Sequence, residues 1–400
     1  MDVLYELWMH CICGFEPDRT FKLNKAVQKM GNSFNSGEMS RRILIENGVP
    51  ETVAARTENT EYFDEAKEII DFCGQNDIRI IPEDSDEYPE YLRQIHMPPR
   101  LLFARGKRMN LNARPGVAVV GCRKPTELGK SAAERIGASL AKAGIVTVGG
   151  MAEGIDSAAP WGALRAGGTT VAVLAGGVDV IYPAVNKRLY GEIVKNGTVI
   201  SERPPSTSGK SYFYEQRNRI VTGISRGTVV VEGKLKSGTS MTARIALEEN
   251  RDLFAVPGNP MCWQSSLPNS MIDEGAVIVK SFDVPARYYT ENNPELFDNT
   301  EQENNIFAYN DSADGVYGKR NPQIADSTAK IGAAAASPAD ERVTDEQKIL
   351  GFLSDRGGTA TNEEIAEACG IPQSRLNGKL TIMSLRGQLR QESGNRYVLK

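Results

Sequence analysis

The alternation of short apolar runs with helix-like segments between Val117 and Val279 is the feature that most constrains the fold. The apolar runs occupy 117–120, 145–148, 170–174, 228–231, 253–256 and 276–279, with a weaker one at 198–200. Helices fit the periodicity at 129–143, 155–166, 186–195, 216–224, 239–250 and 266–274. Continuous apolar strands that alternate with helices are typical of a parallel sheet covered on both faces. We therefore predict an α/β core with a Rossmann-like, doubly wound, mostly parallel sheet.

The segments around this core differ in composition. Residues 1–75 show apolar stripes at helical spacing and predict a small helical (SAM-like) domain. The Rossmann-like domain with its extended lead-in is predicted over 76–285. Residues 286–342 are rich in Asn, Ala, Ser, Asp and Gly, which predicts a linker. Residues 343–400 have the order helix, helix, helix and hairpin, which predicts a winged helix.

Composition excludes several classes of protein. The chain has 400 residues, of which 40% are hydrophobic and 24% charged, as in ordinary globular proteins. We expect neither a membrane span nor a secretory signal, because no apolar run approaches about 20 residues and no basic segment precedes one. The six cysteines form no C-x-x-C pair, and only His10 and His96 could add imidazole. We expect a cytoplasmic protein with no metal or cofactor. The net charge of −4 still permits a local basic site.

Gly-rich turns follow several predicted strands. Gly121 is followed by Cys122, Arg123 and Lys124, and three glycines lie between 149 and 154. Such turns let the backbone and a helix N-terminus approach phosphate, and arginine adds a bidentate fork. The carboxyl ends of parallel strands meet at one edge, so these turns are expected to form a single site. The fingerprint G-x-G-x-x-G is missing, which argues against a dinucleotide.

A second basic cluster is Arg217-Asn218-Arg219. Residues two apart diverge on a helix, so one arginine can face the ligand while the other is buried in a structural pair. Lys210 and Tyr214 precede the cluster, and cations interleaved with aromatic rings suit single-stranded nucleic acid. Anchoring of the loop to the core by its aromatic side chains is an equally good explanation.

A further helix is predicted to open at Ser237-Gly238-Thr239, after the apolar run 228–231. Its hydroxyls can bind phosphate or simply cap the helix. Asp156 is expected to cap a helix or hold a neighbouring turn through backbone N–H groups. No residue is predicted to be catalytic.

Together these motifs resemble the DNA-processing protein A family, also called Smf. The matching segments are Val-Gly-Cys-Arg at 120–123, Gly-Ile-Asp at 154–156, Gly-Ala-Leu at 162–164, Ala-Val-Leu-Ala-Gly-Gly-Val-Asp at 172–179, Tyr-Pro at 182–183, Ser-Glu at 201–202, Arg-Asn-Arg-Ile at 217–220, Ser-Gly-Thr-Ser-Met-Thr-Ala at 237–243, Phe-Ala-Val-Pro-Gly at 254–258 and Gly-Ala at 275–276. The resemblance implies a single-stranded DNA-binding protein that protects incoming DNA, displaces single-strand-binding protein and loads RecA recombinase during natural transformation and recombination. It also implies a homodimer formed through the Rossmann-like domain.

The resemblance assigns roles by position and also shows departures. Arg123 matches the family's DNA-contacting arginine, Tyr214 stands where a phenylalanine is usual, and Lys210 is the nearest candidate for a lysine near that ring. Cys122 replaces the usual Ser or Thr, Pro160 stands where a histidine is usual, and Glu215-Gln216 replaces a Pro-basic pair. These changes are expected to weaken DNA binding or shift its geometry without removing it.

The sequence is also compatible with two other functions. One is a nucleotide-hydrolysing enzyme of the lysine-decarboxylase-like group, whose Pro-Gly-Gly-x-Gly-Thr-x-x-Glu turn corresponds to 234–242 here. The Pro-Gly-Gly is missing, and Thr242 replaces the acid that general acid–base chemistry needs. The other is a nucleotide-sensing transcription regulator that reads duplex DNA through the winged helix. Residues 343–400 carry eight basic and seven acidic side chains, which disfavours it.

Overall fold

The computed structural model describes residues 3–30, 41–46, 48–108, 111–294 and 297, and then 345–371, 376, 379–380, 383, 388–392 and 396–399. The chain divides into two compact units, Met1–Asp311 and Ser312–Lys400. No helix among these residues is long and apolar enough to cross a membrane.

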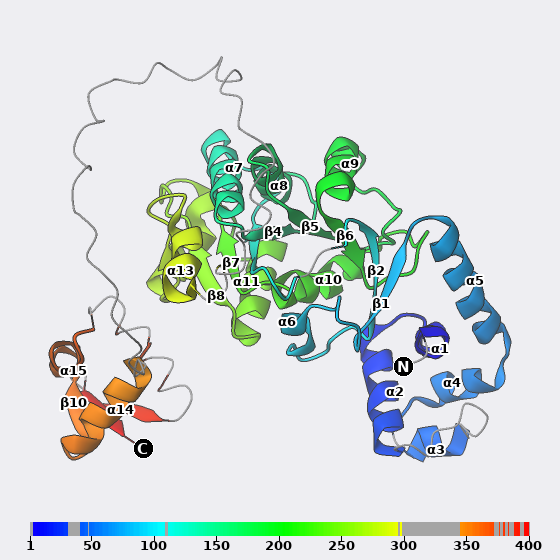
Figure 1. Cartoon of the computed structure of the whole chain (residues 1–400), viewed down its shortest axis with the longest axis horizontal. Helices are drawn as coiled ribbons and strands as arrows, with labels where there is room; N and C mark the ends of the chain where they lie inside the picture. The colour runs from blue at the N-terminus through cyan, green and yellow to red at the C-terminus, as the bar shows by residue number, and fades with distance from the viewer. Residues whose placement is uncertain are drawn as a thin grey trace, which may run out of the picture. The chain divides into compact units, whose positions relative to one another are not determined.

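Within the described residues a nine-stranded sheet forms the centre of the first unit (Figure 1). Its order is β1-β2-β6-β5-β4-β3-β7-β8-β9. Neighbours from β6 to β9 pair in parallel, whereas β2 is antiparallel to both β1 and β6. The prediction of a mostly parallel α/β sheet is confirmed. The strands are β1 (Arg79–Pro82), β2 (Leu101–Gly106), β3 (Gly116–Val120), β4 (Val146–Gly149), β5 (Thr170–Val173), β6 (Thr198–Ser201), β7 (Gly227–Val230), β8 (Asp252–Ala255) and β9 (Val277–Ile278).

Helices cover both faces of the sheet because its strands are apolar on both sides. In β3, Val117 and Val119 enter one hydrophobic cluster, while Ala118 and Val120 enter another on the opposite face. The first face carries α7 (Glu127–Lys142), α8 (Ile155–Arg165), α9 (Lys187–Asn196) and α13 (Val284–Asn292) (Figure 1). The second carries α6 (Glu90–Arg93), α10 (Ser211–Gly223), α11 (Gly238–Glu248) and α12 (Ser266–Asp273).

The strand order reverses between β3 and β7. From β3 the chain proceeds outward through β4, β5 and β6, and it then returns to place β7 on the other side of β3. The loops after β3 and β7 therefore leave the sheet side by side and diverge toward opposite faces. In open α/β sheets this is where ligands bind.

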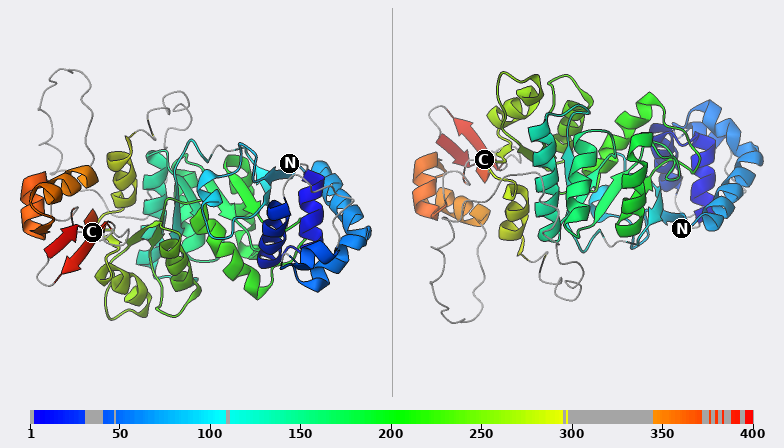
Figure 2. Two further views of the ribbon diagram at one scale, coloured as in Figure 1. Left: turned by 90° about the horizontal axis from the view of Figure 1, so that it is seen from below. Right: turned by 90° about the horizontal axis from the view of Figure 1, so that it is seen from above.

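The α-helices described before the sheet are α1 (Val3–Cys13), α2 (Pro17–Met30), α3 (Arg41–Glu46), α4 (Glu51–Ala54) and α5 (Glu61–Gln75). Both views of Figure 2 place these helices at one end of the sheet, beyond β1. They share a hydrophobic cluster with Leu101 and Phe103 of β2. β2, which lies in the predicted extended lead-in, pairs with β1 and β6 and is therefore a strand of the sheet. α5 continues through Gly74 to Gln75, because a glycine inside a helix costs only about 1 kcal/mol.

The predicted linker begins inside α13. Tyr289 of this helix is buried against Phe254 of β8, with ring centroids 6.0 Å apart, and its hydroxyl donates to Asp252 at 2.8 Å. Residues up to 292 are thus packed on the sheet, whereas 298–342 lie outside the described residues.

The second unit contains α14 (Asp345–Asp355), β10 (Thr359–Thr361), α15 (Asn362–Cys369), β11 (Leu389–Glu392) and β12 (Arg396–Leu399). The predicted hairpin is confirmed as β11 paired with β12, and β10 adds an unpredicted third strand. α15 starts at a capping box of Thr361 and Glu364 and ends at Gly370 in the left-handed conformation, and both features stabilise the helix ends. Most of the predicted third helix falls outside the described residues.

Candidate functional site

A cavity of about 970 Å³ opens where β3, β4 and β7 end. Two of the residues predicted for the site, Lys210 and Arg219, do not line it. The nine others do: Gly121, Arg123, Lys124, Tyr214, Arg217, Asn218, Ser237, Gly238 and Thr239.

The first turn is held in place by Glu232 at the end of β7. Its carboxylate accepts from the backbone N–H of Thr126 at 2.8 Å and from the Thr126 hydroxyl at 2.5 Å. Its backbone oxygen accepts from the Cys122 N–H at 2.8 Å. Burial and this nearby carboxylate raise the pKa of the Cys122 thiol to about 11. The turn is thereby fixed, and Arg123 and Lys124 remain exposed at the cavity.

The second turn is held by Asp156 and Arg217. The Asp156 carboxylate accepts from the Gly150 N–H at 3.2 Å, which confirms that this residue holds a neighbouring turn. Burial raises the pKa of this carboxyl, and the positive charge of Arg217 opposes that effect. The Arg217 guanidinium donates to the Gly150 oxygen at 2.8 Å and to the Val173 oxygen. Arg217 is 7% exposed, and its Nε has no partner among the described residues.

The third element is α10, which begins at Ser211, five residues before the predicted start. Tyr214 and Arg217 therefore lie one helical turn apart on the same face and line the cavity together with Asn218. The Tyr214 ring lies 6.0 Å from the ring of Tyr182, which is 58% exposed at the same cavity.

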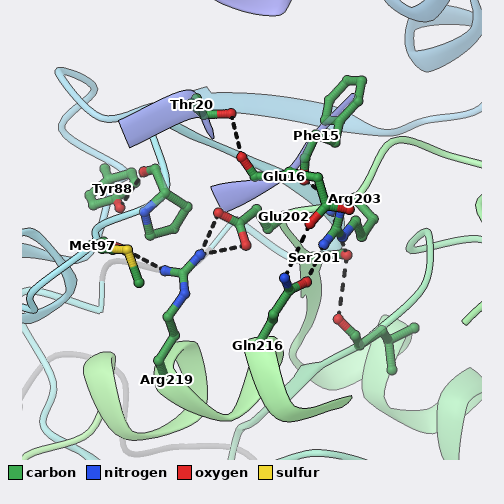
Figure 3. A network of polar contacts seen from close by, with 12 residues as sticks. Phe15, Glu16, Thr20, Tyr88, Met97, Ser201, Glu202, Arg203, Gln216 and Arg219 are labelled. Atoms are coloured by element: carbon green, nitrogen blue, oxygen red, sulfur yellow. Dashed lines mark hydrogen bonds and ion pairs between the residues drawn. The ribbon is translucent and has the colours of Figure 1, made fainter. Parts of the chain in front are cut away.

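Arg219 and Lys210 have other contacts. Arg219 is 8% exposed, and its guanidinium donates to both oxygens of Glu202 at 2.5 and 2.6 Å and to the Met97 carbonyl (Figure 3). Of the two arginines, it is the one in a structural pair. Lys210 is exposed before α10, with its ammonium 5.6 Å from the centre of the Phe213 ring. Phe213 is buried, so for this ring the structure favours anchoring to the core.

The N-terminus of α11 faces the cavity through Ser237, Gly238 and Thr239. The Ser237 hydroxyl accepts from the Ser240 N–H at 3.2 Å and donates to the Lys234 oxygen at 2.7 Å. It therefore caps the helix, whose unpaired N–H groups and dipole favour an anion.

The lining also includes four cationic or aromatic side chains that were not among the predicted site residues: Tyr182, Lys234, Lys236 and Trp263. The two lysines lie between β7 and Ser237, where the sequence predicted that a helix opens. Trp263 comes from the loop after β8 and is 53% exposed. Among the described lining residues, five side chains are cationic and two, Asp156 and Glu215, are acidic. The excess of positive charge suits a ligand with several phosphates.

The described residues contain no group of three His, Cys, Asp or Glu placed to hold a metal ion. The buried carboxylates of Asp156 and Glu232 are engaged with backbone N–H groups. The arrangement suits binding better than proton transfer.

The fold and cavity define a class: doubly wound α/β proteins with a basic, aromatic site at the switch in strand order. Residues 79–288 match the family model of DNA recombination-mediator protein A. DNA processing protein DprA of Bacillus subtilis is 35% identical over 228 residues, which cover 57% of this chain and 77% of that protein. A putative DNA processing protein DprA of Mycobacterium tuberculosis is 30% identical over 372 residues, covering 90% and 86%.

A solved structure agrees with these sequence relatives. The X-ray structure of DNA processing protein A from Streptococcus pneumoniae matches with a TM-score of 0.62 and 31% identity, covering 72% of this chain and 98% of that chain. The chain belongs to the DNA recombination-mediator protein A family.

Proposed function

We propose that the cavity binds single-stranded DNA and that the protein acts in recombination, including the processing of DNA taken up in natural transformation. The observation that carries this proposal is the convergence of loops from the ends of β3, β4, β7 and β8 on one cavity that combines exposed cations with exposed rings. Arg123, Lys124, Lys234 and Lys236 contact phosphates. The rings of Tyr182, Tyr214 and Trp263 stack on bases.

A preference for single strands follows from these side chains. Rings can stack only on bases that are free of a duplex stack, and cations track a backbone without reading sequence. We therefore infer little discrimination among sequences.

The family's description as a DNA recombination-mediator protein supports a role beyond DNA binding alone. We infer that the bound strand is protected, that single-strand-binding protein is displaced, and that RecA recombinase is loaded on the exposed DNA. The protein is proposed to work in the cytoplasm as a homodimer formed through the sheet-containing unit. The second unit, with two helices and a hairpin described, is proposed to be a winged helix.

The two alternative functions receive less support. Thr242 occupies the position where the hydrolases have a glutamate. Its hydroxyl donates to the Gly238 oxygen at 3.1 Å within α11. No observation specifically favours a nucleotide-sensing regulator.

The test is a binding assay of the whole protein with labelled oligodeoxythymidine, the corresponding duplex and nucleoside monophosphates, followed by fluorescence anisotropy and by chromatography for released base. We expect tight binding of the single strand, weaker binding of duplex and no free base. Equal or tighter binding of duplex would contradict the proposal, and release of base would favour the hydrolase.

A further inference from the structure

Helix α10 contributes to two regions of the molecule. Tyr214, Arg217 and Asn218 line the DNA cavity. Gln216 and Arg219 point instead toward the corner between α1 and α2 and toward the residues after β6 (Figure 3). The helix therefore lies between the proposed DNA site and the N-terminal helices.

Both the nitrogen and the oxygen of the Gln216 side-chain amide form hydrogen bonds. Its Nε2 donates to a Glu16 carboxylate oxygen at 3.2 Å, and its Oε1 accepts from the Arg203 guanidinium. Arg203 also donates to the Phe15 carbonyl and lies 3.9 Å from the Glu16 carboxylate. One helical turn earlier, the Tyr212 hydroxyl lies 3.3 Å from the other Glu16 oxygen. Two successive turns of α10 thus contact Glu16, the residue immediately before α2.

The burial of Arg203 constrains the geometry of this contact. The side chain is 4% exposed and lies over the Phe213 ring, 3.8 Å from its centre. A buried cation is tolerated only where acceptors surround it, because leaving it unpaired costs several kcal/mol. Its acceptors come from the α1–α2 corner and from α10, so the two segments must keep their relative positions.

We propose that Gln216, Glu16 and Arg203 are positioning residues for DNA binding, through which the α1–α2 corner sets the placement of α10 and hence of Tyr214 and Arg217. This inference rests on the proposed single-stranded DNA function. A displacement at Gln216 is transmitted to Arg217, its neighbour on the same rigid helix. Gln216, which is one of the departures from the family pattern, thereby has a structural role.

The proposal can be tested by exchanging the side-chain amide of Gln216 with the carboxylate of Glu16. In Gln216→Glu, two carboxylates face each other across the 3.2 Å contact. We expect single-strand affinity to fall roughly tenfold in the full-length protein. The double variant Glu16→Gln/Gln216→Glu restores the pattern, because Glu at 216 accepts from Arg203 and from the new amide at 16. We expect its affinity to return to within about twofold of the wild type.

The salt dependence of binding and a control variant distinguish a positioning role from a direct contact with DNA and from a general effect of added charge. Residue 216 does not line the cavity, so the salt dependence of binding should stay unchanged in every variant. Gln75→Glu makes the same chemical change on exposed α5 and should bind as the wild type does. Unchanged affinity in Gln216→Glu, or failure of the double variant to recover, would overturn the inference while wild-type binding upholds the proposed function. A wild type that does not bind single strands would instead overturn both.

Discussion

Arg123 and Arg217 line the same cavity but differ in what else they touch. Arg123 is exposed, whereas Arg217 is buried against the Gly150 and Val173 carbonyls. Arg123→Ala should therefore keep the wild-type melting temperature and make the salt slope of single-strand binding shallower by about 0.7. Arg217→Ala should destabilise the fold by about 2–4 kcal/mol, because buried carbonyls lose a charged donor. Thermal unfolding and anisotropy titrations at several salt concentrations check both; a melting loss in Arg123→Ala would make it a packing residue.

The rings of Tyr214 and Trp263 contribute in a way that salt does not remove. Truncation to alanine at either position should weaken binding by about 1–3 kcal/mol per base that loses a stacking partner, with no change in the salt slope. Trp263→Phe should retain most of the affinity. Leu247→Ala removes an exposed apolar side chain from α11 that does not line the cavity, and it serves as the control. A slope that changes with the ring would contradict the division between stacking and charge.

Cys122 gives a pH-dependent signal of the Glu232 contact. With the thiol pKa near 11, only about one thiol in a thousand is ionised near pH 8, and the thiolate is the reactive form. Alkylation of Cys122 by iodoacetamide should thus be slow there and rise about tenfold per pH unit toward the pKa. Mass spectrometry of the labelled peptide over a pH series measures this. A rate that levels off near pH 9, as for a free thiol, would show that Glu232 and burial do not act on it.

At the scale of elements, strand and helix positions in the sheet were predictable because apolar runs and turns report them locally. The start of α10 was not. Lys210 provides no side-chain cap, and Tyr212, Phe213 and Tyr214 are only moderate helix formers, so nothing local marks a helix before 216. Burial of Phe213 beneath Arg203 supplies the stability instead, and that contact exists only in the folded chain.

The candidate site was also predictable only in part. Glycines and cations that directly follow strands were found, because strand ends share one edge. Glu232 was not predicted as a site residue, because its partner Thr126 lies 106 residues away in sequence. Trp263 belongs to a loop with no local phosphate signature, and the burial of Arg219 depends on Glu202 from another element.

For the whole molecule, the number of phosphates neutralised sets the response to salt. If Arg123, Lys124, Lys234 and Lys236 each meet one phosphate, the logarithm of the affinity should fall with the logarithm of salt at a slope of about −3 per protomer. A strand held across two protomers should double that slope. Titrations at several protein concentrations, together with a measurement of the protein's mass in solution, distinguish a strand bound by one protomer from a strand held across two. A slope near zero would mean that the cavity's cations do not meet DNA.

The junction between α10 and the α1–α2 corner also constrains how such a chain can change over generations. A cation buried at 203 needs an acceptor at 216 and a carboxylate at 16, so these three positions cannot drift independently. Loss of the arginine would free the other two, and an acid at 216 would be tolerated only with an amide or a neutral residue at 16. Among related chains, substitutions at 16, 203 and 216 should therefore appear together, although the first and last are separated by 200 residues.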